Sequence, residues 1–225
     1  MHADLEHGLG QTISFISPTL LQENGSDKIM MQQNKAQLNQ FINDMEATIR
    51  KYAMESEILQ RAKPLLEELL RSPDSMPQES FKPRKDRFAN NLIYMPDDKI
   101  FSVIGGVFLP GQATPIHDHL TWALIGIYEG GERESYYKRV DDGSNPKVAV
   151  IKKANERINK KGHVTVLGKA GIHRIENVSD KPSLSVHVYG LDIGNTQRNT
   201  YNPVTGEIGN FVSGYDSVLR NPLID

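Results

Sequence analysis

The sequence contains no cysteine among its 225 residues. Disulfide bonds, thiolate zinc sites, iron–sulfur clusters and cysteine nucleophiles are therefore excluded, and any bound metal must take nitrogen or oxygen ligands. A surplus of charge of one sign is also lacking, because 26 basic and 28 acidic residues are mixed along the chain and give a net charge of -2. Without a field of one sign, neither nucleic acid nor an anionic membrane is an expected partner, and small molecules are the expected ligands.

Long apolar runs are missing as well. No stretch approaches the roughly 18 apolar residues of a membrane span, and the first ten residues have no basic region followed by an apolar stretch. We therefore expect a cytoplasmic protein. With 38% hydrophobic and 24% charged residues, the chain has the composition of a globular protein with one sizeable core, and a monomer is compatible with it.

Three segments differ in their patterns. Residues 1–33 are polar without a sustained period, which favours a loose lead-in. Residues 34–85 carry apolar side chains at helical spacing and then a proline-containing connector, which predicts a helical segment packed on the rest of the protein. Residues 86–225 alternate between turn signals and short apolar runs, at 101–108, 122–128, 148–151, 164–167, 172–178 and 184–191. Such a series predicts a mainly β fold, a jelly-roll or cupin barrel.

Two histidines, His117 and His119, follow Gly111 after a gap of five residues. In a strand they point to the same face, and Asp118 points to the other. Two imidazoles on one face can share a metal ion at about 2.0 to 2.1 Å. The pair alone is also compatible with two polar residues near a strand end. A third histidine, His173, at the start of a later strand, favours the metal site.

The spacing resembles that of the cupin superfamily. Its first motif is a glycine, five residues and His-x-His, as in 111–119, and its second ends in a histidine, three residues and an asparagine, as in 162–177. The usual glutamate about four residues after the second histidine is missing from 120–123. A three-histidine site without that acid resembles the site of the thiol dioxygenases, whose neutral ligands leave the metal a charge that a thiolate can offset. The resemblance implies iron(II) with the ligands His117, His119 and His173.

Ser185, His187 and Tyr189 alternate along a later strand and therefore share one face. They resemble the Ser-x-His-x-Tyr triad of the cysteine dioxygenase family, in which the serine orients the imidazole and the imidazole positions the phenol. This implies a catalytic role for all three. A solvated strand face is the alternative. The resemblance to the family covers roughly residues 88–209.

Three further residues are implied as substrate contacts. Trp122, the only tryptophan, resembles a tryptophan of the mercaptopropionate-type dioxygenases, although a tryptophan of the barrel core is the alternative. Asn90 stands where the mammalian-type enzyme has a carboxylate-binding arginine. Arg198 resembles the arginine of the mercaptopropionate-type enzymes that faces the substrate carboxylate, and its alternative is an exposed loop arginine. A cysteine that crosslinks to the triad tyrosine would align near Ala123, so Tyr189 must act uncrosslinked.

These features predict an iron(II)-dependent thiol dioxygenase that uses O2 to oxidise a small carboxylate-bearing thiol, cysteine or 3-mercaptopropionate, to its sulfinic acid. A zinc-type three-histidine cupin hydrolase or isomerase is one alternative, and a non-catalytic metabolite-binding cupin is another. The triad argues against both, because neither needs an ordered phenol opposite the metal. The ligands must be neutral to bind, so activity should fall below their reference pKa of about 6.5.

Overall fold

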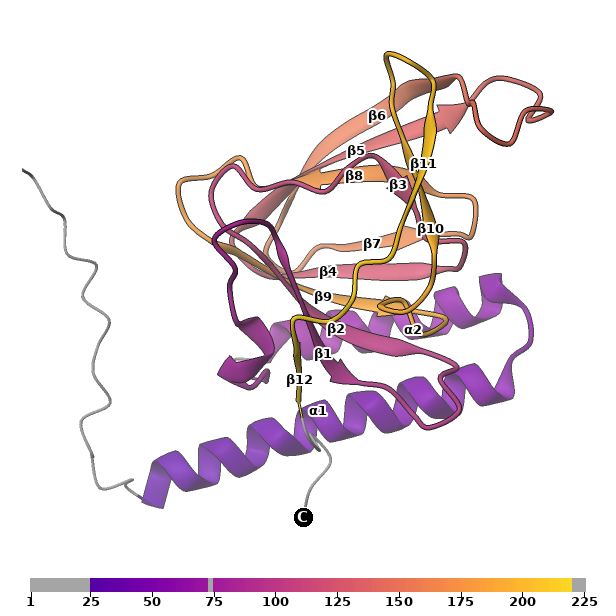
Figure 1. Ribbon diagram of the computed structural model, residues 1–225. Helices are drawn as coiled ribbons and strands as arrows, with labels where there is room; N and C mark the ends of the chain where they lie inside the picture. Colours follow the sequence, from indigo (N-terminus) through magenta and orange to yellow (C-terminus); the bar gives the residue numbers. More distant parts are fainter. Residues whose placement is uncertain (1–24, 73–74, 220–225) are drawn as a thin grey trace, which may run out of the picture.

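The computed structural model describes residues 25–72 and 75–219. Two α-helices, α1 (Gly25–Lys51) and α2 (Glu55–Arg71), precede a short 3-10 helix, η1 (Gln78–Phe81), and the strands (Figure 1). The strands are β1 (Ala89–Tyr94), β2 (Ser102–Phe108), β3 (His117–Asp118), β4 (Ala123–Glu129), β5 (Gly131–Arg139), β6 (Ile151–Lys160), β7 (Val164–Leu167), β8 (Ile172–Glu176), β9 (Ser183–Tyr189), β10 (Arg198–Tyr201), β11 (Ile208–Phe211) and β12 (Ser217–Val218).

The predicted helical segment begins earlier than its apolar pattern indicates. Helix α1 begins at Gly25, nine residues before the expected start at Asn34. Lysine, methionine and glutamine predominate in 28–33, and these residues favour a helix without forming an apolar stripe. Residues 1–24 of the expected lead-in lie outside the described residues. No helix in the described part of the chain has both the length and the apolar character needed to cross a membrane.

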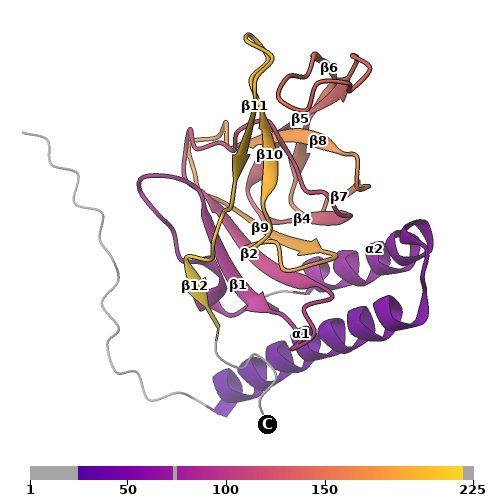
Figure 2. The same cartoon turned by 45° about the vertical axis from the view of Figure 1, so that its right-hand side comes forward.

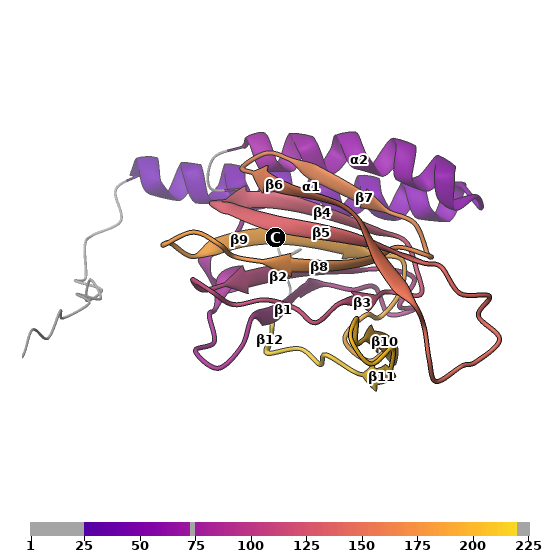
Figure 3. The same cartoon turned by 90° about the horizontal axis from the view of Figure 1, so that it is seen from above.

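The strands form two six-stranded sheets. The first has the order β12-β1-β2-β9-β4-β7, and the second has the order β11-β10-β3-β8-β5-β6. They face each other across the barrel interior, and Figure 3, a view from above, shows the helices along one side and the β10–β11 hairpin on the other. Nearly all the pairings are antiparallel, and β9 and β8 lie near the middle of their sheets. This arrangement is the predicted cupin fold, a double-stranded β-helix.

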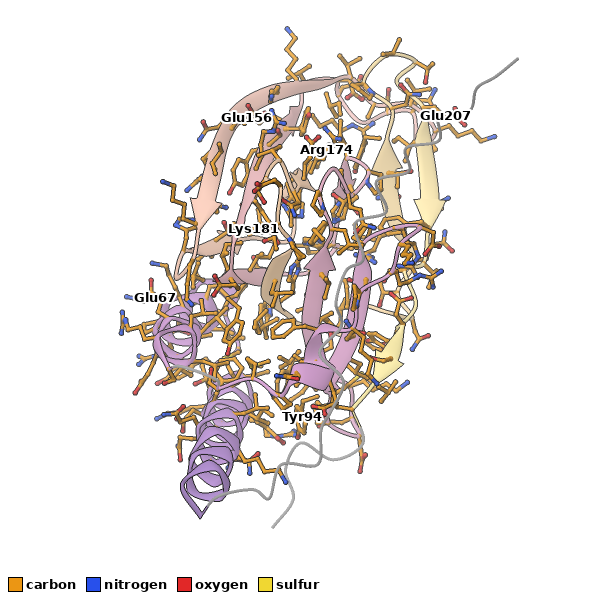
Figure 4. The ribbon with its side chains drawn as sticks, turned by 90° about the vertical axis from the view of Figure 1, so that its left-hand side faces the viewer. Glu67, Tyr94, Glu156, Arg174, Lys181 and Glu207 are labelled. Atoms are coloured by element: carbon orange, nitrogen blue, oxygen red, sulfur yellow. The ribbon has the colours of Figure 1, made fainter. Side chains whose placement is uncertain are left out.

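The two helices cover the outer face of the first sheet, below the barrel in Figures 1 and 2. Helix α2 lies on β4, where Gly126 allows the approach, because an added Cβ would lie 2.6 Å from Leu70 Cδ1 and 3.1 Å from Leu66 Cδ2. Tyr94, labelled near the helices in Figure 4, hydrogen-bonds to Glu46 of α1 at 3.1 Å. The central strands of the first sheet, such as β2 and β4, are therefore buried on both faces.

The second sheet has an open, charged outer face. Seven consecutive residues of β6, from Lys152 to Ile158, are exposed, and Glu156 and Arg174, labelled in Figure 4, belong to this sheet. Strand β5 alternates instead, with Glu132 and Glu134 buried inside the barrel. The apolar runs of the sequence did not predict β1, β5, β10, β11 and β12 or most of β6, because these strands are polar or very short.

Candidate active site

Three histidine side chains meet between the two sheets. His117 on β3 and His173 on β8 are register partners across an antiparallel pair, and His119 follows β3 directly. The Nε2 atom of His119 lies 3.1 Å from that of His117 and 3.2 Å from that of His173. All three side chains are buried. The predicted ligands therefore converge on one point, as a metal site requires.

The other face of β3 is anchored to β10. Asp118 points away from the histidines and accepts hydrogen bonds from the backbone N–H of Asn199 at 3.0 Å, from its side-chain Nδ2 at 2.8 Å, and from the Tyr201 hydroxyl at 2.8 Å. Directly after His119, Leu120 takes a φ of 57°, a left-handed conformation that is uncommon for a bulky side chain. Hydrogen bonds from β10 to Asp118 thus hold β3 in place despite its two-residue length.

Hydrogen bonds at the far ring nitrogens fix two of the imidazoles. His117 Nδ1 donates to the carbonyl of Pro115 at 3.0 Å, and His173 Nδ1 donates to Glu134 Oε1 at 2.7 Å. Since these partners can only accept, both Nε2 atoms present lone pairs to the centre. Burial opposes ionisation of Glu134, but hydrogen bonds from His173, Tyr136 and Thr165 outweigh it and hold the pKa of this carboxyl below its usual range.

The three nitrogens fit one metal ion. Nitrogen ligands at about 2.0 to 2.1 Å from an ion lie about 3 Å apart in neighbouring coordination positions, which matches the observed separations. Burial lowers the pKa of His117 and of His119 well below its ordinary value, so both are neutral and able to coordinate. Lone pairs that face one another in a buried site need a cation between them. Because these pKa values are lowered, His117 and His119 should become protonated, and so stop binding metal, only below the pH of about 6.5 expected from the sequence.

The Ser-x-His-x-Tyr residues lie inside the barrel, on β9. Ser185 Oγ and His187 Nε2 are 2.8 Å apart, and His187 Nδ1 and the Tyr189 hydroxyl are also 2.8 Å apart. The Tyr189 ring stands edge-on to the His119 ring, with 4.9 Å between centroids. Val186, which lies between Ser185 and His187 in the sequence, points the other way and packs toward the helices. The alternative of a solvated strand face is therefore wrong, because the opposite face is covered by helices and this face lines the barrel.

Burial keeps these groups neutral. It lowers the pKa of His187 to about 3 and raises the pKa of the Tyr189 hydroxyl. Ala123 is the register partner of Tyr189 on β4, so the position where a crosslinking cysteine would align does lie beside the phenol. With alanine there, Tyr189 remains a free phenol that can donate or accept a proton.

A small, partly enclosed cavity opens onto the histidines. It is lined by Phe88, Asn90, Phe108, Thr114, Pro115, His117, His173, Ile175, His187, Tyr189, Ile193, Arg198, Phe211 and Ser213. Of the predicted substrate contacts, Asn90 and Arg198 therefore reach this cavity. Two of the three catalytic candidates, His187 and Tyr189, line it as well.

Arg198 is buried in the cavity wall. It is 4% exposed, begins β10, and lies over the Phe211 ring, with 4.4 Å from Cζ to the centroid. In the described part of the chain it makes no ion pair, and its Nε has no hydrogen-bond partner. Burial lowers the pKa of this guanidinium. The alternative of an exposed loop arginine is therefore wrong, and the side chain has free donors for an anion.

Trp122 lies elsewhere. Its side chain is buried in the core between the first sheet and the helices and is absent from the residues that line the cavity. An added Cβ at Gly190 would lie 2.3 Å from Trp122 Nε1, so this glycine makes room for the indole. The expectation that Trp122 contacts substrate is not supported, because its side chain packs in the core on the helix side of the first sheet.

Several residues of the site were not predicted from the sequence. Glu134 supports His173. Phe211 lies against Arg198 and also against His117, and the centroids of the Phe211 and His117 rings are 5.8 Å apart. Ser213 completes the cavity wall. The spacing of Glu132 and Glu134 could have indicated strand β5, because two residues that are two positions apart face the same side of a strand. The positions of Phe211 and Ser213 depend on how the C-terminal hairpin folds back, which no local pattern indicates.

Comparison with solved structures finds distant likenesses. The chain is 17% identical to the TT1209 protein of Thermus thermophilus, with a TM-score of 0.37 over 49% of this chain and 89% of that one. A Klebsiella pneumoniae protein with a double-stranded β-helix domain is 15% identical, with a TM-score of 0.35 over 59% of this chain and 91% of that one. A recombinant oxalate oxidase is 15% identical, with a TM-score of 0.38 over 57% of this chain and 56% of that one. The match therefore spans little more than half of the oxalate oxidase chain.

A family model identifies the chain more directly. The model of cysteine dioxygenase type I matches residues 85–198. The matched range contains the three histidines, the Ser-His-Tyr strand and Arg198, and it ends where β10 begins. It therefore covers most of the part of the barrel that builds the site, and Phe211 and Ser213 of the cavity wall lie beyond it. The chain belongs to the cysteine dioxygenase type I family.

Proposed function

We propose that this protein is an iron(II)-dependent thiol dioxygenase that converts a small carboxylate-bearing thiol and O2 into the sulfinic acid. The observation that carries the proposal is a cluster of three convergent histidines beside one cavity. Two of these histidines, His117 and His173, line the cavity together with Tyr189 and the buried, unpaired Arg198. The overall reaction balances, since RSH and O2 together give RSO2H. His117, His119 and His173 would hold the iron, which when bound supplies the redox chemistry that O2 requires.

Arg198 would hold the substrate carboxylate. An unpaired guanidinium in a buried wall is costly unless an anion pairs with it, and its planar fork suits a carboxylate. Among the described residues that line the cavity there is no aspartate or glutamate, so an ammonium group has no charged partner. Asn90 offers a neutral amide. These features favour 3-mercaptopropionate at least as much as cysteine.

Tyr189 would supply a hydrogen bond to the reacting groups. Its hydroxyl is held by His187, which is held in turn by Ser185, so the phenol has a fixed direction. Its raised pKa keeps the proton on the phenol, where it can be donated to a thiol or oxygen bound beside the histidines. Binding both reactants in one small cavity makes the step effectively intramolecular.

A zinc enzyme that activates water is the principal rival, because three histidines also suit zinc. Zinc has no redox chemistry, whereas the family that this chain matches is named for a dioxygenase reaction, in which O2 is reduced. The ordered phenol opposite the histidines favours the dioxygenase as well, since a zinc-bound water does not need it.

Oxygen uptake by metal-defined protein tests the proposal. The chain is stripped of metal, reloaded with Fe2+ or with Zn2+, and supplied with 3-mercaptopropionate, cysteine or cysteamine. Thiol-dependent O2 uptake and sulfinate formation are expected with Fe2+ alone, fastest for the thiols that carry a carboxylate. Equal activity with Zn2+, or iron-loaded protein that consumes no O2 with any of the three thiols, would refute it.

A further inference from the structure

The C-terminal part of the chain connects the two sheets beside the cavity. Residues 211–216, called the strap from here on, run from the last residue of β11 in the second sheet to β12 at the edge of the first. Figures 1 and 2 show this connection descending from β11 to β12. Phe211 and Ser213 of the strap line the cavity. The strap lies outside the residues that the family model matches, so the family match assigns it no role.

Asp216 anchors the strap to β1. Its Oδ1 atom accepts hydrogen bonds from Arg84 at 2.9 Å and from Arg87 at 2.6 Å. Its Oδ2 atom accepts from Arg87 at 3.1 Å and from the backbone N–H of Asn90 at 2.8 Å. The backbone N–H of Asp216 donates in turn to the Asn90 carbonyl at 2.7 Å. These bonds fix the carboxylate in one orientation and tie it to a residue of the cavity wall.

The same anchor supports the aromatic side of the cavity. Arg87 Nη1 also donates to the backbone carbonyl of Phe88 at 2.9 Å. The Phe88 ring stacks on Phe108, with 5.3 Å between centroids and 10° between planes. Both rings line the cavity, whereas Asp216 does not. Asp216 therefore acts on the cavity through the residues that it holds, which are the strap itself and the neighbouring residues of β1.

A second anchor holds the strap at the adjoining residue. The Tyr215 hydroxyl donates to Asp192 Oδ1 at 2.6 Å and accepts from the backbone N–H of Gly194 at 3.0 Å. The backbone N–H of Gly214 donates to the Gly194 carbonyl at 2.9 Å. An added Cβ at Gly194 would lie 2.3 Å from Tyr215 Cζ, so the glycine lets the ring lie this close. Ile193, between the two residues that Tyr215 contacts, lines the cavity.

We propose that Asp216 is a positioning residue that holds the strap against the cavity and so limits the length of thiol that the site accepts. Through the strap it fixes Phe211, on whose ring Arg198 lies. A thiol that spans the three-histidine site and Arg198 then has a fixed distance to cover. One methylene group more or less in a fitted pocket changes kcat/KM by about tenfold to two-hundredfold. That the ligand is a carboxylate-bearing thiol rests on the proposed function.

Asp216→Asn tests the anchor with little change of shape. The amide keeps one acceptor oxygen, so the two arginines and the backbone N–H of Asn90 can no longer all be satisfied. Arg84 retains Asp86 at 2.6 Å, but in the described part of the chain Arg87 forms no other ion pair. Asp86→Asn is the matched control. It makes the same change at the other carboxylate that Arg84 contacts, which is 63% exposed, and it leaves the strap anchored.

The measurement is kcat/KM from O2 uptake by the iron-loaded full chain, for 3-mercaptopropionate and for 4-mercaptobutyrate, which is one methylene longer. The wild type should favour the shorter thiol. In Asp216→Asn this preference should fall by about tenfold with the metal content unchanged, because the wall yields to the longer thiol. Asp86→Asn should keep the wild-type preference. A wild type without a preference, an equal loss for both thiols, or an unchanged preference in Asp216→Asn overturns the proposal.

Hydrogen–deuterium exchange without thiol separates this inference from the proposed function. In Asp216→Asn the amides of residues 88–92 and 211–219 should exchange faster, whereas those of α2 should not change. Tyr215→Phe, which removes one hydroxyl from the second anchor, should shift exchange and thiol preference in the same direction, and it replaces Asp216→Asn if that variant does not fold. A wild type inactive with every thiol would refute the proposed function, and the exchange would still decide whether Asp216 holds the strap. Unchanged exchange at the strap overturns the anchoring itself.

Discussion

The two sheets of the barrel differ in what covers their outer faces and in what they bring to the site. The first sheet is covered by helices and contributes the hydrogen-bond chain of β9. The second sheet is open to solvent and contributes all three histidines, from β3 and β8 and the residue after β3. Apolar packing thus supports the half that carries the Ser-His-Tyr strand, and buried hydrogen bonds support the half that could hold metal.

The difference shows how a polar site is kept in place without a large core beneath it. On the second sheet, Glu134 is held by three neighbours besides His173: Tyr136, Asn159 and Thr165. A buried hydrogen-bond network of this kind rigidifies the groups that it contains. On the first sheet, the same task falls to side chains such as Leu66 and Val186, packed between helix and strand. The predictions below separate the two kinds of support.

Removing a ligand from the second sheet should have the largest effect. We expect His173→Ala to lose the bound metal and all thiol-dependent O2 uptake, because two imidazoles on one short strand cannot close a site that needs three protein ligands. Elemental analysis of the purified variant measures this. His163→Ala, a histidine outside the site, is the matched control and should keep its metal. Full metal occupancy in His173→Ala would remove His173 from the ligand set.

Truncating the helix-facing core should affect stability more than any change on the open face. Leu66→Ala is expected to lower the free energy of unfolding by about 2 to 5 kcal/mol, because Leu66 is fully buried against Gly126 and leaves a cavity. Ile158→Ala on the open face of β6, where the side chain is 60% exposed, should change it by less than about 0.5 kcal/mol. Denaturant titration compares them, and equal losses would contradict the contrast between the sheets.

Loss of the guanidinium should depend on the substrate. Arg198→Ala would leave a substrate carboxylate unpaired, at a cost of about 2 to 4 kcal/mol, or roughly thirtyfold to a thousandfold in kcat/KM for 3-mercaptopropionate. Cysteamine, which has no carboxylate, should be little affected. Equal losses for both thiols would indicate that Arg198 supports the fold, for example through its contact with Phe211. A strong wild-type preference for cysteine would point to an amine-binding group elsewhere in the protein.

Removing one hydroxyl from the first sheet should have the smallest effect. Tyr189→Phe is expected to keep the metal and to lower kcat by roughly tenfold to a thousandfold, as the loss of a proton-donating or orienting group does. Tyr128→Phe, on the helix-facing side where Tyr128 stacks on Phe81, makes the same change away from the cavity and should turn over normally. Unchanged turnover in Tyr189→Phe at saturating thiol would exclude the phenol from the reaction.

The contrast between the sheets also explains what could be predicted from the sequence. Strands buried on both faces, such as β2 and β4, are continuous apolar runs and were found. Strands β5 and β6 carry charged residues along a solvent-exposed face and were missed. The motif histidines were located because their spacing is local. Neither the burial of Arg198 at the start of β10 nor the position of Trp122 away from the cavity could be predicted, because their surroundings depend on a hairpin and a helix layer that no local pattern encodes.

The central claim, that this cavity inserts O2 into a thiol, is tested most directly by isotope labelling. Iron-loaded protein is supplied with 3-mercaptopropionate under 18O2 in ordinary water, and the sulfinate is analysed by mass spectrometry. We predict that both oxygen atoms of the sulfinate carry the label, because the two atoms of one O2 molecule end on one sulfur. A product whose oxygen comes from water, or no sulfinate at all from iron-loaded protein, would contradict this claim.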